Sequence, residues 1–152
     1  MVKVRVVVQS EDFNIADEIN SLCKSRTDLG ALTTFTGLVR DTHENKNIKK
    51  MTLEHFPNMA LKELNKIGVI AKKRWQIEEL TIIHRYGELF PGDQIVLVIT
   101  ASHHREDSFK AAQFIMDMLK TDAPFWKKEE LDDGSRWVTS NKSDKDKKNR
   151  WI

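Results

Sequence analysis

Residues 80–121 read LTIIHRYGELFPGDQIVLVITASHHREDSFKAAQFIMDMLKT. Apolar and β-branched residues fill positions 80–83 and 95–101, which predicts two buried strands, and Pro91-Gly92 predicts a turn between them. Residues 105–121 carry apolar side chains at helical spacing, and Pro124 follows to end that helix. The expected apolar stripe consists of Phe109, Ala112, Ile115, Met116 and Leu119. This stretch therefore predicts strands and a helix within one domain.

The sequence before this stretch shows the same mixture of patterns. The expected elements are a strand at 2–8, a helix from the N-cap Asn14 to about residue 26, a strand at 30–40 bulged at Gly37, a strand at 51–56 and a helix that begins at Pro57. The buried face of this last helix is expected to consist of Leu61, Leu64, Gly68, Ala71 and Trp75. Residues 41–47 are wholly polar, so we expect a mobile loop there.

The sequence after this stretch predicts a final pair of strands at 125–131 and 135–138, joined by Asp132-Asp133-Gly134. Beyond Thr139 the composition changes to Lys, Asp, Ser and Asn, which indicates a solvated tail. We therefore expect one domain at 1–139 and a polar, basic tail at 140–152. Because strands and helices alternate irregularly, the fold class is expected to be α+β, with a mixed or antiparallel sheet and about three helices.

The charge of the chain is nearly balanced. It has 25 basic and 23 acidic side chains, and residues 141–150 hold five of the basic and two of the acidic ones. The remaining body is close to neutral, whereas a nucleic-acid-binding protein usually presents a broad basic face. We therefore expect no nucleic-acid partner, and any site for an anion must be local.

The composition also limits where the protein acts and what it binds. No apolar run approaches the ~20 residues of a membrane span, and the alternating start predicts a strand rather than a signal peptide. A single cysteine, Cys23, suits a reducing cytoplasm. Adjacent His103 and His104 diverge on a strand or helix, so we expect no metal site there.

Two lysines stand out near the end of the third helix pattern. Lys120 lies in its last turn, where a cation is also favourable for the helix alone. Strand periodicity places Lys127 on one face with Phe125 and Glu129. Apolar rings beside an ammonium group lower its pKa and make the neutral amine accessible as a base or nucleophile. The alternative for Lys127 is a surface lysine paired with Glu129.

A second cluster of cations, His103-His104-Arg105, is expected where a strand ends and a helix begins. Free N–H groups at a helix N-terminus, together with Arg and His, form a reasonable site for a phosphate or carboxylate. The alternative is an ordinary helix start with exposed polar residues. Arg40, at the end of its strand, is a third candidate cation. The residues alone thus predict a local anion site, without specifying a reaction.

Six motifs in series carry a resemblance to a known family. They are Thr34-Phe35-Thr36-Gly37-Leu38-Val39-Arg40, Leu53-Glu54-His55-Phe56-Pro57, Ile83-His84-Arg85-Tyr86-Gly87-Glu88-Leu89, Pro91-Gly92-Asp93, His104-Arg105, and Leu119-Lys120-Thr121 with Ala123-Pro124-Phe125-Trp126-Lys127. Together they closely resemble the large, catalytic subunit family of molybdopterin synthase, from about residue 13 to residue 138.

The resemblance implies an α/β hammerhead fold and a sulfurtransferase activity. Two such subunits are expected to form a homodimer at the centre of a heterotetramer with a small ubiquitin-like subunit. That partner carries a thiocarboxylate on its C-terminal Gly-Gly tail. The reaction implied is the transfer of two sulfurs to cyclic pyranopterin monophosphate, which forms the dithiolene of molybdopterin for molybdenum cofactor biosynthesis. The resemblance implies no cofactor and no resident metal.

The resemblance also implies roles for individual residues. Lys120 and Lys127 match the two catalytic lysines: we expect Lys120 to meet the glycine terminus and Lys127 to act as a base or to stabilise charge. The residues that match substrate-binding positions are Leu38, Val39, Arg40, His104, Arg105, Lys128 and Glu129, with Phe35 and Met116 as walls of the channel for the tail.

Two other functions were considered for the same residues. A module could bind a ubiquitin-like protein without catalysis, but the lysines and cations of the motif series argue for chemistry. An RNA-binding domain is suggested only by the aromatic and basic mixture Phe125-Trp126-Lys127-Lys128, and the neutral body argues against it.

Overall fold

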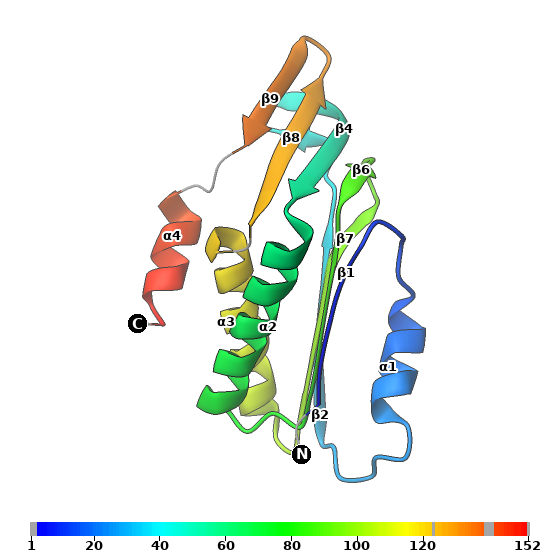
Figure 1. The fold of residues 1–152 in the computed structure, drawn as a ribbon, viewed down its shortest axis with the longest axis vertical. Helices are drawn as coiled ribbons and strands as arrows, with labels where there is room; N and C mark the ends of the chain where they lie inside the picture. The colour runs from blue at the N-terminus through cyan, green and yellow to red at the C-terminus, as the bar shows by residue number, and fades with distance from the viewer. Residues whose placement is uncertain (1–2, 123, 139–141, 152) are drawn as a thin grey trace.

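The computed structural model describes residues 3–122, 124–138 and 142–151 (Figure 1). The elements in chain order are β1 (Lys3–Gln9), α1 (Ile15–Cys23), β2 (Ala31–Leu38), β3 (Thr42–His43), β4 (Lys46–His55), α2 (Pro57–Arg74), β5 (Glu79–Arg85), β6 (Gly87–Leu89), β7 (Gln94–Ser102), α3 (Arg105–Asp122), β8 (Phe125–Leu131), β9 (Gly134–Val138) and α4 (Lys142–Asn149). The α+β class is confirmed. None of the helices in these ranges is both long and apolar enough to cross a membrane.

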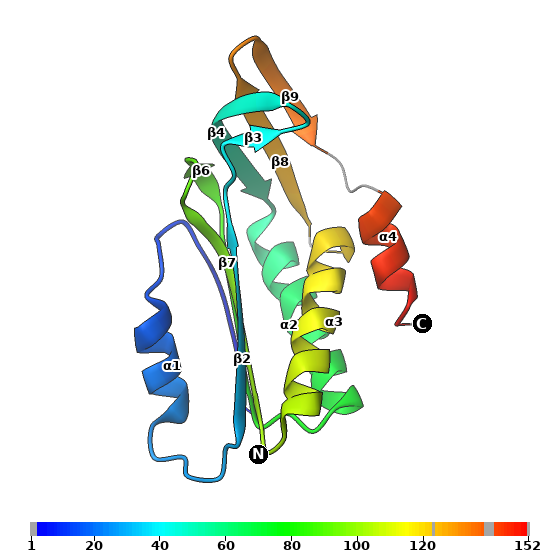
Figure 2. The same ribbon diagram turned by 180° about the vertical axis from the view of Figure 1, so that it is seen from behind.

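The larger sheet has the strand order β1-β5-β7-β2. β1 pairs with β5 in parallel, and the other neighbours are antiparallel. Helices α2 and α3 cover one face of this sheet and α1 covers the other (Figures 1 and 2). Because both faces are covered, the central strands β5 and β7 are buried along nearly their whole length rather than at alternate residues.

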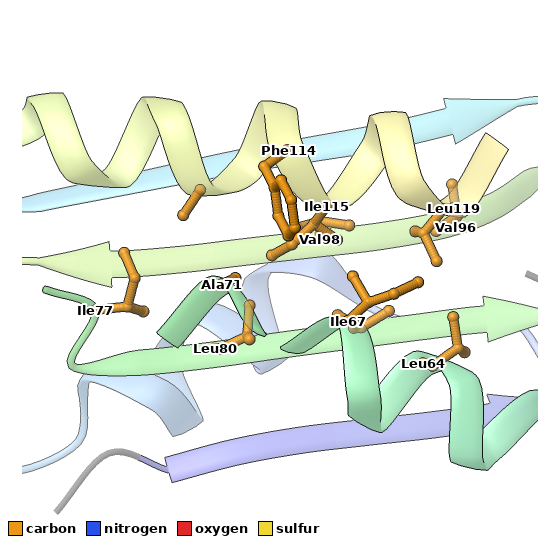
Figure 3. Close-up of a cluster of buried hydrophobic side chains, with 12 residues drawn as sticks. Leu64, Ile67, Ala71, Ile77, Leu80, Val96, Val98, Phe114, Ile115 and Leu119 are labelled. Carbon is orange, nitrogen blue, oxygen red and sulfur yellow. The ribbon is translucent and has the colours of Figure 1, made fainter. Parts of the chain in front are cut away.

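The main core lies between this sheet and helices α2 and α3 (Figure 3). Phe114 of α3 is 2% exposed and packs with Ile115 and with Leu64 and Ala71 of α2 above the sheet residues Leu80 and Val98. A second cluster fills the space between the sheet and α1, and consists of Phe13, Ile83, Leu97 and Ile99 with residues of α1 packed on it. The larger sheet is thus a rigid, doubly covered platform.

A smaller sheet lies at one end of the elongated molecule, beyond α2 and α3 (Figures 1 and 2). Its strand order is β3-β4-β8-β9, and β6 pairs with the free side of part of β4. In the antiparallel register of β4 and β8, Lys127 is paired with Leu53 and Phe125 with His55. Since β8 follows directly after α3, the segment with both lysines joins the two parts of the molecule.

Several local predictions are confirmed. The Asn14 side chain accepts a hydrogen bond from the Asp17 amide, 3.0 Å long, and caps α1. Pro57 is the first residue of α2, and the register of β2 against β7 shifts between Gly37 and Leu38. At Gly37 an added Cβ would lie 2.8 Å from a methyl of Val96, so the glycine permits close approach of the two strands.

The prediction of a mobile loop at 41–47 is wrong. His43 pairs with Lys46 in a tight hairpin, and the two turn residues Glu44 and Asn45 both adopt positive φ angles, 52° and 64°. The hairpin is held from outside by a contact with Glu129 of β8. Polar composition concealed it, because the residue that anchors the hairpin is distant in the sequence.

The prediction of a solvated tail is wrong for residues 142–151, whereas residues 140, 141 and 152 lie outside the described ranges. Residues 142–149 form α4, which lies beside α3 in both views (Figures 1 and 2). The Trp151 ring packs on the main core. The composition indicated solvation because all eight residues of α4 are polar. Among the described residues from 142 to 151, Trp151 is the one apolar residue, and its ring makes the contact with the core. The domain boundary at residue 139 stays a prediction.

Two members of the expected apolar stripes are exposed. Phe109 of α3 is 61% exposed and Leu61 of α2 is 40% exposed. Both lie at helical spacing from core residues, but neither belongs to the buried cluster between the helices and the sheet. On α2, Ala60 and Ile67 are buried as well.

Candidate functional site

Two adjoining cavities lie where the larger sheet, α3 and the smaller sheet meet. The first, the apolar cavity, has a volume of about 380 Å³. Lys120 and Lys127 line it, which brings together the two lysines that the sequence singled out. Its other walls are largely hydrocarbon and include Phe35, Leu38, Met51, Leu53, Met116, Phe125 and Trp126. Phe35 and Met116 thus line the same cavity as the lysines, and their role as walls of a channel for the tail stays a prediction.

The second, the charged cavity, has a volume of about 370 Å³. It shares Lys120, Lys127 and Leu38 with the apolar cavity. The residues that only this cavity adds are mostly ionisable, and include Arg40, His43, Glu129 and Arg136. Clustered cations of this kind suit an anionic ligand. The lysine pair therefore lies on a wall shared by an apolar and a charged space.

Lys127 has the environment of a reactive amine. Burial lowers the pKa of Lys127, and the positive charge of Lys120 lowers it further. The carboxylates of Glu129 and Asp144 act in the opposite direction without reversing the shift. The prediction that nearby apolar groups lower the pKa of this lysine is confirmed, so neutral amine is more accessible here than on an exposed lysine.

A stack of rings forms part of the floor beneath the lysines. The His84 ring lies 3.8 Å from the Phe125 ring, centroid to centroid, and the His55 ring also stacks with Phe125, at 5.7 Å. Burial lowers the pKa of His84 to about 4, and the charge of Lys120 adds to this effect. The neutral ring donates a hydrogen bond from Nδ1 to the Arg85 carbonyl, 2.9 Å away. His84 thus places an uncharged, polar ring against the apolar cavity that it lines.

Glu129 fixes one wall of the charged cavity. Its carboxylate is almost completely buried and accepts hydrogen bonds from His43 Nδ1, at 2.9 Å, and from Arg136 Nε, at 3.1 Å. Burial alone would raise the pKa of Glu129, but these hydrogen bonds outweigh it and hold the pKa below its usual value. Arg136 also donates to the His43 carbonyl. Glu129 therefore connects β3, β8 and β9.

His104 and Arg105 lie apart from the lysines. With Gly30 and His103 they line a separate opening at the start of α3. This opening adjoins the beginning of β2, because the Gly30 amide donates to the Ser102 carbonyl, whereas the lysine cavities adjoin Leu38 at the end of that strand. An eight-residue strand separates the two places by roughly 25 Å. A single copy of the chain thus keeps these cations away from the lysine pair.

Val39 and Lys128 occupy positions next to the cavities. Val39 is buried in a cluster with Met51, Leu53 and Leu89, and so supports the wall from behind. The Lys128 ammonium lies 5.8 Å from the centre of the Trp137 ring, on the opposite face of β8 from Lys127.

Several residues that line the cavities were not predicted from the sequence, and three of them are of chemical interest. Asp144 of α4 lines both cavities, His84 lies under the lysines, and Arg136 of β9 lines the charged cavity. His84 belongs to the motif at residues 83–89 that carries part of the family resemblance, and this motif could have indicated it. Asp144 lies in a charged run whose composition is typical of a tail, and nothing local marks it.

One group of side chains has the spacing of metal ligands. Asp28, Glu78 and His103 place their ligand atoms within 4.8 Å of one another. Arg26 already binds both carboxylates, at 2.7 Å from Asp28 and 3.3 Å from Glu78. The His103 Nε2 atom lies 3.1 Å from the Glu78 carboxylate. The arrangement is therefore an ion-pair network that ties the end of the larger sheet together.

Several known proteins are similar to this chain in sequence and in architecture. A family model described as MoaE protein matches residues 8–122. The molybdopterin synthase catalytic subunit of Brucella melitensis is 49% identical over 148 residues, which cover 96% of this chain and 90% of the relative. That of Escherichia coli K12 is 44% identical over 151 residues, which cover 99% of this chain and 100% of the relative.

Solved structures agree with this comparison. A molybdopterin biosynthesis MoaE protein from Burkholderia ambifaria superposes with a TM-score of 0.82 at 43% identity, over 99% of this chain and 98% of that one. Molybdopterin synthase from Staphylococcus aureus superposes with a TM-score of 0.79 at 30% identity, over 88% of this chain and 95% of that one. The motifs, the fold and the full-length similarity together lead to one conclusion: the chain belongs to the MoaE family, to which it is related through molybdopterin synthase catalytic subunits.

Proposed function

We propose that this protein is the catalytic subunit of molybdopterin synthase, a sulfurtransferase of molybdenum cofactor biosynthesis. It receives sulfur from the thiocarboxylated C-terminus of a small ubiquitin-like subunit and transfers it to cyclic pyranopterin monophosphate. The observation that carries the proposal is the position of Lys120 and Lys127 on the wall shared by the apolar and the charged cavity. Two different substrates can approach one pair of amines from these two spaces.

The apolar cavity suits the tail of the small subunit. A Gly-Gly segment is thin and lacks side chains, so it fits a narrow space between Phe35, Leu38 and Met116. Exposed apolar residues continue from the cavity onto the surface: Trp126 lines the cavity and packs edge to face on the exposed Phe56 ring, 5.0 Å away. This continuity provides a surface for the body of the partner beside its inserted tail.

The charged cavity suits the pterin and its cyclic phosphate. Arg40 and the two lysines bring positive charge to it, and Glu129 holds His43 and Arg136 in place. Once the sulfur of the tail has bonded to the pterin, water attacks the acyl carbon, and a nearby ammonium stabilises the oxyanion that forms. Collapse of this intermediate breaks the acyl carbon–sulfur bond, leaves the sulfur on the pterin and returns the tail as a carboxylate. We assign stabilisation of the oxyanion to Lys120, and assign proton removal to Lys127 because its pKa is lowered.

A homodimer would complete the site with the remaining cations. β2 is an edge strand of the larger sheet and exposes Leu32, Phe35 and Leu38. If a second copy pairs with it in antiparallel fashion, the start of one β2 meets the end of the other. His104 and Arg105 of the second copy would then lie near Arg40 and the lysines of the first. We propose this central dimer, with a small subunit on each side, acting in the cytoplasm.

The dimer is tested by Leu32→Glu, which places a charge on the edge strand. We expect the variant to sediment as a monomer and to lose most of its sulfur transfer. Leu61→Glu is the matched control, because Leu61 is exposed to the same degree on α2, 40% against 39%. A monomeric wild-type protein, or a dimer that Leu32→Glu leaves intact, would contradict pairing through β2.

The reaction is tested by mixing the protein with thiocarboxylated small subunit and cyclic pyranopterin monophosphate and measuring molybdopterin. We expect product with the wild type and a loss of at least about 100-fold in Lys120→Ala and in Lys127→Ala. Lys110→Ala is the control, since Lys110 lies exposed on the same helix as Lys120. Binding of the small subunit without product from the wild type would instead indicate a docking module.

A further inference from the structure

The C-terminal helix α4 reaches the cavities that hold the lysine pair. Asp144, in its first turn, lines both the apolar and the charged cavity together with Lys120 and Lys127. All the other residues that line the apolar cavity belong to the region up to Val138. A carboxylate from the end of the chain therefore stands within the site at which an anionic substrate is proposed to bind.

A specific set of contacts holds this helix in place. Arg150 and Trp151, which follow α4, both bind Asp117 of α3, and we call this the C-terminal latch. One carboxylate oxygen of Asp117 accepts hydrogen bonds from Arg150 Nη2, at 2.7 Å, Arg150 Nε, at 3.1 Å, and Trp151 Nε1, at 2.6 Å. Asp117 is nearly buried, so these donors satisfy a charge that would be costly alone.

Aromatic packing adds to the latch. The Trp151 ring makes edge-to-face contacts with Trp75 at 5.4 Å and with Phe114 at 5.6 Å. Arg74 of α2 also contacts the latch, because its Nη1 donates a hydrogen bond to the Trp151 carbonyl at 2.7 Å. In the last turn of α4, Lys148 Nζ donates a hydrogen bond to Asp122 of α3, also at 2.7 Å. These contacts fix the direction of α4 along α3, which Figures 1 and 2 show from opposite sides.

We infer that α4 is part of the active site, and that the C-terminal latch positions Asp144 as a counter-charge to the lysine pair. The inference rests on the proposed function in one respect, namely that Lys127 takes part in catalysis. Asp144 is a positioning residue in this scheme: it acts through the protonation of Lys127 rather than on the reacting atoms.

The charges around Lys127 explain why this carboxylate matters. Lys120 on α3 and Arg40 after β2 favour the neutral amine, as does burial. Glu129 on β8 and Asp144 on α4 favour the ammonium. The Glu129 carboxylate already accepts hydrogen bonds from His43 and Arg136. Glu129 lies on the same strand as Lys127, whereas Asp144 lies on the separate helix α4. The distance of Asp144 from Lys127 therefore depends on the latch that holds α4.

The protonation of Lys127 can be measured without any substrate. Limiting amounts of an amine-acylating reagent modify only the neutral amine, and mass spectrometry of the peptide that contains Lys127 gives the rate at each pH. We expect Asp144→Asn to accelerate modification at neutral pH about two- to fivefold, the range that corresponds to one partly exposed ion pair. Asp146→Asn is the matched control, since it removes the same charge from an exposed position on α4.

Trp151→Ala tests the latch itself. It leaves every cavity residue unchanged, and because Trp151 lies beside the end of the chain the domain is expected to fold. We expect faster modification of Lys127, in the same direction as Asp144→Asn, and no further increase when the two changes are combined. Equal rates for Asp144→Asn and Asp146→Asn, or an unchanged rate in Trp151→Ala, would overturn the inference.

Product formation then connects the latch with catalysis. In Asp144→Asn and in Trp151→Ala, the limb of the pH–rate profile that reports Lys127 is expected to move to lower pH. If the wild type forms no molybdopterin, the proposed function fails while the acylation result still decides the role of Asp144. If the wild type is active and neither variant moves the profile, only the inference fails.

Discussion

Lys127 shows how one side chain acquires reactivity from its neighbours. In isolation it is an ordinary strand lysine. The cavity removes water from around its ammonium group, and Lys120 adds a like charge, so the pKa falls. The same two causes act on His84, whose pKa falls to about 4. At the scale of the residue, the site is therefore a place where protonated forms are disfavoured.

Lys127→Arg separates charge from proton transfer. Arginine keeps a cation in the cavity but does not release its proton at any working pH. We expect product formation to fall about 10²- to 10⁴-fold, the usual contribution of a general base. The measurement is molybdopterin formed in single-turnover conditions, with binding of the small subunit as the control for folding. Near-normal activity in the variant would show that charge alone suffices.

His84 makes the stability of the fold depend on pH. Its pKa is about 4 in the folded chain and near 6.5 when unfolded, so the unfolded chain binds the extra proton between these values. The contribution of neutral His84 is complete above about pH 6.5 and is lost as the pH falls toward 4. We expect His84→Gln to remove about 2 kcal/mol of the stability difference between pH 7 and pH 5. Urea unfolding at both pH values measures this.

The β3–β4 hairpin illustrates what an element requires beyond its composition. Its turn residues, Glu44 and Asn45, adopt positive φ angles that most side chains avoid. Asn tolerates this conformation, which is consistent with its presence at the second position. The hairpin persists because His43 is bonded to the buried Glu129 on a strand that lies far along the chain. Local preference and a long-range contact are both needed.

Substitutions at Asn45 test the conformation of this turn. Asn45→Gly is expected to change the free energy of unfolding by less than about 0.5 kcal/mol, because glycine adopts positive φ freely. Asn45→Val is expected to lose about 1–2 kcal/mol, since a β-branched residue is strained there. Denaturant unfolding measures both, with Lys49→Val on the neighbouring strand as the control. Equal stability of the Gly and Val variants would be incompatible with this turn.

At the scale of the whole molecule, one helical layer stabilises both the platform and the site. Helix α3 packs its apolar face on the larger sheet, carries Lys120 at its end and receives the C-terminal latch on its outer side. Phe114 is central to this arrangement, because it contacts Trp75 and Trp151 as well as the sheet. A change at this residue affects the fold and the end of the chain together.

Phe114→Ala is expected to lower the free energy of unfolding by about 3–5 kcal/mol, because it leaves a cavity in the main core. Phe109→Ala on the same helix is the natural comparison, since its ring is 61% exposed and its loss should cost less than about 0.5 kcal/mol. Guanidinium unfolding of the two variants provides the test. Similar losses in both would contradict the packing of α3 described above.

The sequence by itself determined the mixed α+β class, the caps and starts of the helices, the bulge at Gly37 and the pairing of Lys120 with Lys127 in one region. Each of these depends on local spacing or on a motif read within a short window. The burial of Leu64, Ala71, Ala112, Ile115 and Leu119 also followed from periodicity. Leu61 and Phe109 are exposed instead, and the buried residues Ala60, Ile67 and Phe114 lie outside the predicted stripes.

The tertiary structure alone decided the hairpin at Glu44, the place of α4 and the separation of His104 and Arg105 from the lysines. Asp144 enters the cavities because Asp117, nearly thirty positions earlier, binds Arg150 and Trp151. Such contacts join residues that lie far apart in the sequence. A hydrogen bond or a ring contact between distant segments leaves no periodicity in either of them, and for that reason folding had to bring these segments together before their role could be seen.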